Sequence, residues 1–438
     1  MATEDNEYRQ RQQQRAEARR KRERAQKMMM IRLAVAAAVI IAVGFVIWMV
    51  TRDGKQPGTP AQTQPNTPAI STQAPEQTEP VVREERTTVS VTVAGDLNVT
   101  TDTVNAGLTP YGYDFGPVFR DVAPLLTNAD VTVLNFEGNL FGIPYGQDNA
   151  SAPQELMQTM ADIGVDMIQM ANSYSIRNGL LGLESTLNGI RAAGMEPLGA
   201  YATNAEFKES QGFTVRDING VRLAFVAFTK GMDNLGLPAG SENCVNVLYE
   251  DYATTYQKVA VDKINSILKN VRSAEPDYVI ALLHWGSEYN DAISDTQEDI
   301  LELMQANGVD AIIGTHSHMV HEISYDDTTG FLVAYSLGDF FGDGSRGGTN
   351  YSIILDLEIT KDPVDGITRV TDYSYIPIYT LSEGEAADGN RRVVRIRETM
   401  AAYDVNYVDK VSGSGYNSMK TALERIANRT SPPPPTED

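Results

Sequence analysis

The chain has 438 residues, of which 42% are hydrophobic and 21% charged, so it can bury a sizeable core and differs from a disordered sequence. The net charge is −22. Ten Lys/Arg and five Asp/Glu give residues 1–32 a charge of +5, so the remainder carries −27. Such a negative charge repels phosphate backbones and argues against a nucleic-acid partner. Cys244 is the only cysteine, which excludes an intrachain disulfide and a cysteine-based zinc site.

The first 50 residues predict a single membrane anchor. Residues 33–50 carry no charge, and at ~1.5 Å per residue this run nearly crosses a ~30 Å hydrocarbon core. Residues 1–32 are basic and are expected to stay in the cytoplasm, which predicts a single-pass cell-membrane protein with its C-terminal domain outside. A cleaved secretory signal is the main alternative, but the apolar run is long for one and no small-residue cleavage pattern follows it.

Two polar segments flank a predicted globular domain at residues 88–430. Residues 51–87 are rich in Pro, Gln and Thr with few large apolar side chains, so they cannot bury enough surface to fold and are expected to form a linker. Residues 431–438 begin with a Ser and four prolines and are expected to be a disordered tail.

Within residues 88–430, short β-branched apolar runs alternate with helical patterns, which predicts an α/β fold with a largely parallel sheet. Strands are expected at residues 90–95, 131–136, 165–170, 222–228, 278–285, 310–315 and 331–337. Helices are expected at 116–127, 153–163, 180–193, 251–273 and 295–306. The turn at 217–220 predicts a hairpin, and two antiparallel strands (351–360 and 368–379) and two helices (391–404 and 416–428) are expected to complete the chain.

Unusual polar residues cluster at the ends of the predicted strands, where open α/β sheets gather their functional groups. The candidates at these ends are Asp96, Asn135, Glu137, Asn172, His284, Glu288, His316 and His318. Carboxylates and imidazoles on one rim suit a divalent metal, and a carboxylate could bridge two ions that activate water and clamp a phosphate. The spacing of His316 and His318 would place both side chains on one side of an extended loop.

Each residue alone also has a purely structural interpretation. Asp96 could cap a helix or turn, Glu137 could lie on the surface, and His284 could be a core imidazole. His321 lies beyond the paired histidines and is treated as structural. Asp339 follows another strand, and the sequence favours a turn residue and a site residue at the rim equally. Taken together on consecutive strand ends, the residues favour a metal site.

Seven segments, in this order, resemble the CapA family, which is named for poly-γ-glutamate capsule synthesis and is related to the calcineurin-like metallophosphoesterases. The segments are AGDLN (94–98), NFEGNL (135–140), AN (171–172), GLLGLESTLNGIRAAG (179–194), LLHWGSEYN (282–290), GTHSHMVHEI (314–323) and VAYSLGDF (333–340). The resemblance implies a four-layer αββα sandwich of metallophosphoesterase type with one or two divalent ions (Mn, Zn or Fe). It also implies work on an anionic surface polymer or its precursor, with other membrane capsule-synthesis proteins as partners.

The resemblance further implies roles for individual residues. The metal ligands would be Asp96, Glu137, His284, His316 and His318. Glu288 and Asn172 are the catalytic candidates, and Asn135 and Arg177 the substrate-binding ones.

One stretch departs from the family pattern Ala-Asn-Asn-His-x-x-Asp-x-Gly. Here Ser173, Tyr174 and Arg177 replace the second Asn, the His and the Asp. In phosphoesterase relatives that Asn binds metal and that His protonates the leaving group, whereas a tyrosine, with a pKa of about 10, is a poor acid at neutral pH. Arg177 would instead hold a substrate anion.

Three functions compete on these observations. A metal-dependent hydrolase or transferase uses the intact ligands. A non-catalytic capsule-assembly or polymer-binding factor fits the missing histidine. A pure adhesion or stalk protein fits the anchor and linker but leaves the histidine clustering unexplained.

Overall fold

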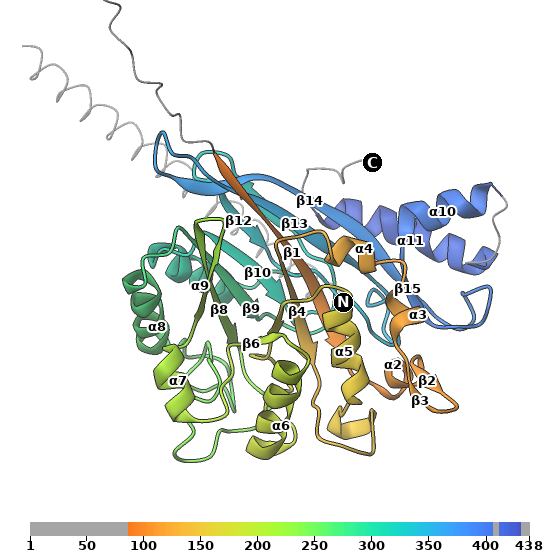
Figure 1. Cartoon of the computed structure of the whole chain (residues 1–438), viewed down its shortest axis with the longest axis horizontal. Coiled ribbons are helices and arrows are strands. Elements are labelled where there is room, and N and C mark those ends of the chain that lie inside the picture. The colour runs from red at the N-terminus through yellow and green to blue at the C-terminus, as the bar shows by residue number, and fades with distance from the viewer. Residues whose placement is uncertain (1–85, 406–410, 431–438) are drawn as a thin grey trace, which may run out of the picture. The chain divides into compact units, whose positions relative to one another are not determined.

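Two β-sheets form the centre of the computed structural model, which describes residues 86–405 and 411–430 (Figure 1). The first sheet has the order β15-β14-β13-β1-β4-β5-β6, with β1 (Thr87–Asn98), β4 (Val131–Glu137), β5 (Met167–Gln169), β6 (Glu196–Leu198), β13 (Tyr351–Lys361), β14 (Thr368–Leu381) and β15 (Arg392–Arg395). The second has the order β11-β12-β10-β9-β8-β7, with β7 (Thr214–Ile218), β8 (Val221–Thr229), β9 (Tyr278–His284), β10 (Ala311–Thr315), β11 (Ile323–Asp326) and β12 (Phe331–Ala334). A small separate hairpin joins β2 (Leu108–Thr109) and β3 (Gly112–Tyr113).

The strands that the sequence predicted as parallel are parallel. In the first sheet β1, β4, β5 and β6 pair in parallel, and in the second β8, β9, β10 and β12 do. The predicted β7–β8 hairpin and the antiparallel β13–β14 pair are also confirmed. The parallel strands bring their carboxyl ends to one edge of each sheet, which is the edge that carries the candidate site.

Helices complete the described part of the chain. They are α2 (Thr101–Asn105), α3 (Gly116–Phe119), α4 (Ala123–Leu126), α5 (Gln154–Asp162), α6 (Gly179–Ala192), α7 (Asn204–Ser210), α8 (Val261–Ser273), α9 (Asp295–Ala306), α10 (Ile396–Asp404) and α11 (Gly413–Arg429), with a 3-10 turn at Gln147–Asn149.

Period-two burial along the strands of the second sheet shows the layer order. On β8, Leu223 and Phe225 belong to the core shared with the first sheet, whereas Ala224 and Val226 belong to a second core with α8 and α9. The helices α5, α6 and α11 share the larger core with the first sheet. Figure 1 shows α8 and α9 beyond one side of the sheets and α10 and α11 beyond the other. The described part therefore has the expected helix–sheet–sheet–helix order.

Two predicted helices are interrupted for local reasons. The one expected at 116–127 is divided into α3 and α4, because Pro124 has no N–H to continue the helix and its ring clashes with the preceding turn. The one expected at 251–273 begins only at Val261. Before it, Asp251 accepts hydrogen bonds from the backbone N–H of Gln257 (2.8 Å) and Lys258 (3.0 Å), which ties residues 251–258 into a turn.

The C-terminal helix expected at 391–404 is likewise only partly formed. Arg392–Arg395 pair with β14 as strand β15, and α10 begins after them. The sequence patterns also missed the short elements β6, β11 and α7.

Gly95 fixes a segment of the first sheet to the loop that follows β12. A Cβ at Gly95 would lie 1.8 Å from the carbonyl oxygen of Gly338, and that oxygen accepts a 3.0 Å hydrogen bond from the N–H of Asp96. Only glycine permits so close an approach of two backbones. The contact holds Asp339 beside the end of β1.

The membrane anchor stays a prediction. None of the helices within residues 86–405 and 411–430 is long and apolar enough to cross a bilayer. The predicted tail 1–32, the predicted span 33–50 and the C-terminal tail 431–438 lie outside the described residues, as does the linker 51–87 except for its last two residues.

Candidate metal centre

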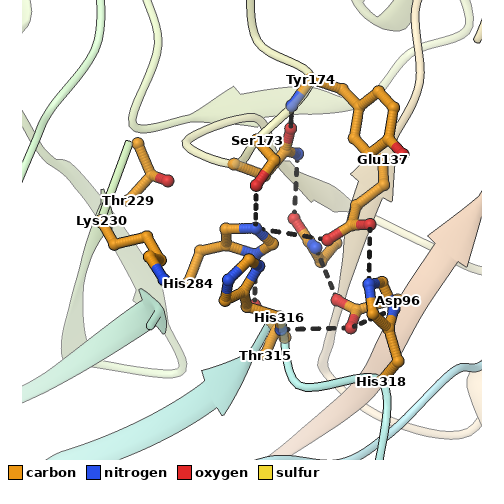
Figure 2. Close-up of polar contacts among 12 residues, drawn as sticks. Asp96, Glu137, Ser173, Tyr174, Thr229, Lys230, His284, Thr315, His316 and His318 are labelled. Carbon is orange, nitrogen blue, oxygen red and sulfur yellow. Dashed lines mark hydrogen bonds and ion pairs between the residues drawn. The ribbon is translucent and has the colours of Figure 1, made fainter. Parts of the chain in front are cut away.

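The five predicted metal ligands lie where strands of the two sheets end (Figure 2). Asp96 belongs to the last part of β1, and Glu137 is the last residue of β4. His284 is the last residue of β9, and His316 and His318 follow β10 directly. The parallel registers of β1 with β4 and of β9 with β10 place residues that are far apart in sequence at the carboxyl ends of the two sheets.

These residues form two groups that share one member. Ligand atoms of Glu137, His284 and His316 lie within 4.8 Å of one another, and so do those of Asp96, Glu137 and His318. All five side chains are buried. Glu137 therefore stands between two potential ion positions, as expected of a bridging carboxylate.

The hydrogen bonding of Glu137 tests whether this donor set fits a cation. Both of its carboxylate oxygens are buried and have no hydrogen-bond partner among the described residues, although Oε1 lies 3.3 Å from Nε2 of His284. The Nδ1 atom of His316 is also buried, and no described residue hydrogen-bonds to it. A buried carboxylate with unused lone pairs is costly in a protein interior. A divalent ion on either side of Glu137 would satisfy these atoms, so the residues fit such a group.

Asp339 orients one of the imidazoles. Its Oδ1 lies 2.8 Å from Nδ1 of His318, which leaves Nε2 facing Oε2 of Glu137 at 3.8 Å. A carboxylate behind a ligand histidine fixes the ring and raises its basicity. The sequence did not decide whether Asp339 is a turn residue or part of the site at the rim. The structure places it in the site.

Polar side chains hold His284 from both sides. Its Nδ1 lies 3.1 Å from Oγ1 of Thr315, and its Nε2 lies 3.2 Å from Oγ of Ser173. Ser173 thus occupies the neighbourhood of the ligands at the position where the family pattern has asparagine.

A buried chain of amides supports Asp96. Nδ2 of Asn135 donates to Oδ1 of Asp96 (2.6 Å), and Nδ2 of Asn172 donates to Oδ1 of Asn135 (3.1 Å). Oδ1 of Asn172 in turn accepts from the backbone N–H of Tyr174 (2.9 Å). Neither asparagine is more than 1% exposed. In the structure both amides position Asp96 and the backbone of Tyr174. The substrate contact expected of Asn135 and the catalytic role expected of Asn172 stay predictions.

The two remaining candidates lie at the rim of the centre. Glu288 is exposed and lines the same pocket as His316. Arg177 is half-buried, and its guanidinium donates to the carbonyl of Asp148 (2.8 Å) and to the carboxylate of Asp233 (3.3 Å). Arg177 lines a neighbouring pocket with Tyr174 rather than the pocket beside His316.

The two histidines after β10 converge in a way that the sequence did not indicate. His316 and His318 have φ values of +92° and +59°, so the loop is turned and not extended as expected. The N–H of His316 donates to Oδ2 of Asp96 (3.2 Å), which stabilises this unusual backbone. Both rings nevertheless face Glu137, and their centroids lie 6.3 Å apart. His321 belongs to neither ligand group.

Burial dominates the electrostatics of the cluster. It raises the pKa of Asp96 to about 7 and that of Glu137 well above its usual value, and the nearby carboxylates add to both shifts. Burial also lowers the pKa values of His284 and His316. For His318 burial acts in the same direction, but the charges of Asp339, Glu137 and Asp96 outweigh it and raise the pKa.

An aromatic stack on one of the ligand histidines was missed by the sequence patterns. The ring of Tyr289 stacks on His318 with centroids 5.1 Å apart, and the guanidinium of Arg346 lies 4.5 Å from the Tyr289 centroid. Tyr289 falls within the family-like segment 282–290, so the resemblance could have indicated it. No pattern around Arg346 marks it.

The fold and the cluster define a four-layer α/β protein with a candidate two-ion centre at its strand ends. The chain belongs to the bacterial capsule synthesis protein PGA_cap family, whose model matches residues 90–343. This match confirms the resemblance seen in the sequence.

Two curated relatives carry related names. The chain is 27% identical over 278 residues to the capsule biosynthesis protein CapA of Bacillus anthracis, covering 62% of this chain and 64% of the relative. It is 24% identical over 253 residues to the PGA biosynthesis protein CapA of Bacillus subtilis (strain 168), covering 56% of this chain and 62% of the relative. The chain thus spans less than two thirds of the length of either relative.

Solved structures show a fainter likeness. The calcineurin-like phosphoesterase YfkN of Bacillus subtilis is 15% identical with a TM-score of 0.40, covering 78% of this chain and 98% of that one. A novel phosphatase from Mycoplasma pneumoniae is 14% identical with a TM-score of 0.42, covering 67% and 95%. At such low TM-scores these structures add nothing to the family assignment.

Proposed function

We propose that this chain is a membrane-anchored, extracytoplasmic protein that acts in the synthesis of a capsule or a poly-γ-glutamate-type surface polymer through a metallophosphoesterase-like centre. The observation that carries the proposal is Glu137, a buried carboxylate that two ligand groups share and to which no residue in the described part of the chain hydrogen-bonds. The names of the two curated relatives support the polymer, and the uncharged run at 33–50 behind a basic segment supports the anchor.

The chemistry follows from what the centre would hold. Two groups of imidazole and carboxylate ligands suit Mn²⁺, Zn²⁺ or Fe²⁺, with one or two ions bound. Such ions act as Lewis acids on a phosphoryl group and lower the pKa of water. The protein contributes orientation, because Asp339 fixes the ring of His318 and Asn135 fixes the carboxylate of Asp96.

Charge bears on the proposed substrate, an anionic surface polymer or its precursor. Residues 33–438 carry −27, so the protein as a whole repels a polyanion. Divalent ions in the cleft would reverse the sign of the field at that point. We therefore propose that the polymer or its precursor meets the protein at the metal centre, alongside other membrane capsule-synthesis proteins.

A second candidate function is a non-catalytic assembly or polymer-binding factor. The observation that favours it is Tyr174, which stands where phosphoesterase relatives have the histidine acid. Burial, followed by the charge of Glu137, raises the pKa of its phenol above the usual value. The phenol therefore neither releases nor accepts a proton near neutral pH.

The double variant Ser173→Asn with Tyr174→His separates the two candidates. It restores the amide of the family pattern beside His284 and the imidazole at the next residue. We therefore expect it to hydrolyse a generic phosphodiester at least about 100-fold faster than the wild type, the contribution typical of a general acid. Initial rates in Mn²⁺ measure this, and Arg191→Gln, remote from the cluster, is the control.

Each outcome assigns the natural protein to one function. Activity that appears only in the double variant identifies the natural chain as the non-catalytic factor. Metal-dependent activity in the wild type, whether or not the double variant exceeds it, identifies it as an enzyme that works without the histidine acid.

A further inference from the structure

Lys230 lies at the edge of the candidate metal centre and belongs to neither ligand group. It is the first residue after β8, and its backbone N–H donates to the carbonyl of His284 (2.8 Å). Because β8 and β9 run in parallel with Thr229 opposite His284, the sheet register fixes Lys230 next to a ligand. Figure 2 shows its side chain directed toward His284 and His316.

The Lys230 side chain lines a pocket of about 200 Å³ that opens beside His316. The aromatic ring of Tyr256 and the carboxylates of Asp233 and Glu288 line the same pocket. Tyr256 reaches it from the turn that replaces the start of the expected helix 251–273. The pocket therefore joins a ligand of the candidate centre to one ammonium group and two carboxylates.

The ammonium of Lys230 has unused hydrogen-bonding capacity. Its Nζ donates to the carbonyl of Gly286 (2.7 Å) and lies 4.8 Å from the ring centroid of Tyr256. Within residues 86–405 and 411–430 it forms no ion pair, and Asp233 pairs instead with Arg177 at 3.3 Å. An ammonium has three donors, so two remain for a ligand in the pocket.

Burial also makes this ammonium receptive to an anion. The charged ammonium loses part of its hydration in the half-buried pocket. An anion that enters would return part of the lost stabilisation through charge-assisted hydrogen bonds.

Arg177, the anion-binding residue expected from the sequence, is less suited to this task. Two sides of its guanidinium are used by Asp148 and Asp233, and it does not line the pocket beside His316. Lys230 is thus the cation among the described residues that lines the pocket and has donors to spare.

We propose that Lys230 binds an anionic oxygen of the phosphoryl group that the metal centre engages, so that the group lies between the ions and the ammonium. The proposal rests on the proposed function, because it takes the ions to be present. Glu288 and Asp233 would then face the uncharged or cationic part of the same substrate. Lys230 is, on this account, a substrate-binding residue with no role as a metal ligand.

A phosphate titration tests this directly. The full-length chain is loaded with Mn²⁺ in detergent, and its affinity for inorganic phosphate is measured. Lys230→Met keeps the apolar stem and removes the charge, and we expect phosphate affinity to fall about tenfold or more, the usual effect of losing a charge-assisted hydrogen bond. Bound Mn²⁺ per chain should not fall. Lys230→Arg keeps a cation and should retain most of the affinity, whereas Lys258→Met, which removes an exposed lysine paired with Glu250, should retain all of it.

The outcomes separate this inference from the proposed function. Three results would overturn the role of Lys230 alone. They are equal phosphate affinity in the wild type and Lys230→Met, loss of Mn²⁺ from Lys230→Met, and a wild type that binds Mn²⁺ but no phosphate. A wild type that takes up no Mn²⁺ overturns the proposed function and this inference with it. If Lys230→Met does not fold, the comparison of Lys230→Gln with Lys230→Arg decides the same question.

Discussion

The Glu137→Gln variant is expected to lose both divalent ions. Among the described residues Glu137 alone belongs to both ligand groups, so neutralising it removes a ligand and a negative charge from each ion position at once. Removing a residue that only hydrogen-bonds to a metal ligand typically lowers metal affinity about 10–100-fold. We therefore expect a loss of at least about 100-fold for each ion, measured by titration calorimetry with Mn²⁺.

Two further variants make this expectation specific. Glu288→Gln removes an exposed carboxylate from the adjoining pocket and should leave Mn²⁺ affinity nearly unchanged. His316→Ala takes a ligand from one group only and should weaken one ion while the group of Asp96, Glu137 and His318 keeps the other. Full Mn²⁺ binding in Glu137→Gln, or an equal loss in Glu288→Gln, would show that Glu137 does not bridge two ions.

The metal-free protein is expected to lose stability as pH rises above about 7. In the folded state the pKa of Asp96 is raised to about 7, and those of Glu137 and His318 are raised well above their usual values. A raised pKa means that the folded state holds a proton that the unfolded state has released. The stability from that proton is present below the unfolded pKa and is lost as pH rises through the folded pKa.

The size and controls of this effect follow from the same linkage. Each proton held only by the folded state lowers the free energy of unfolding by about 1.4 kcal/mol per pH unit. His284 and His316 have lowered pKa values, so above pH ~7 they are neutral in both states and add no slope. Urea unfolding in a chelator measures the trend, and Asp96→Asn should reduce it, because the charge of Asp96 helps to raise the pKa values of Glu137 and His318. Saturating Mn²⁺ should abolish it, because ions favour the ionised carboxylates. Stability that rises with pH in the chelator would contradict the burial of these acids.

The position of the site could be predicted because it depends on the backbone. Buried parallel strands have recognisable β-branched runs, and their register carries Asp96 and Glu137 to the carboxyl end of one sheet and His284 and His316 to that of the other, whatever the side chains do. The same rule, applied to the strand expected at 222–228, would have indicated Lys230, which follows that strand by two residues.

What could not be predicted depends on side-chain partners and backbone turns. Nothing in the sequence shows that the amide of Asn135 donates to Asp96 and that of Asn172 to Asn135, because these hydrogen bonds join three different strand ends. The carboxylate of Asp251 ends a helical pattern by capturing two backbone N–H groups, an interaction that periodicity does not register. The positive φ of His316 likewise depends on a distant acceptor, Asp96.

Elemental analysis of the full-length chain tests the central claim most directly. After incubation with Mn²⁺ and Zn²⁺ and removal of the excess, the wild type should retain one or two divalent ions per chain, and the double variant His316→Ala with His318→Ala, which takes an imidazole from each group, should retain none. A wild type that retains no ion, or a double variant that retains as many as the wild type, would contradict it.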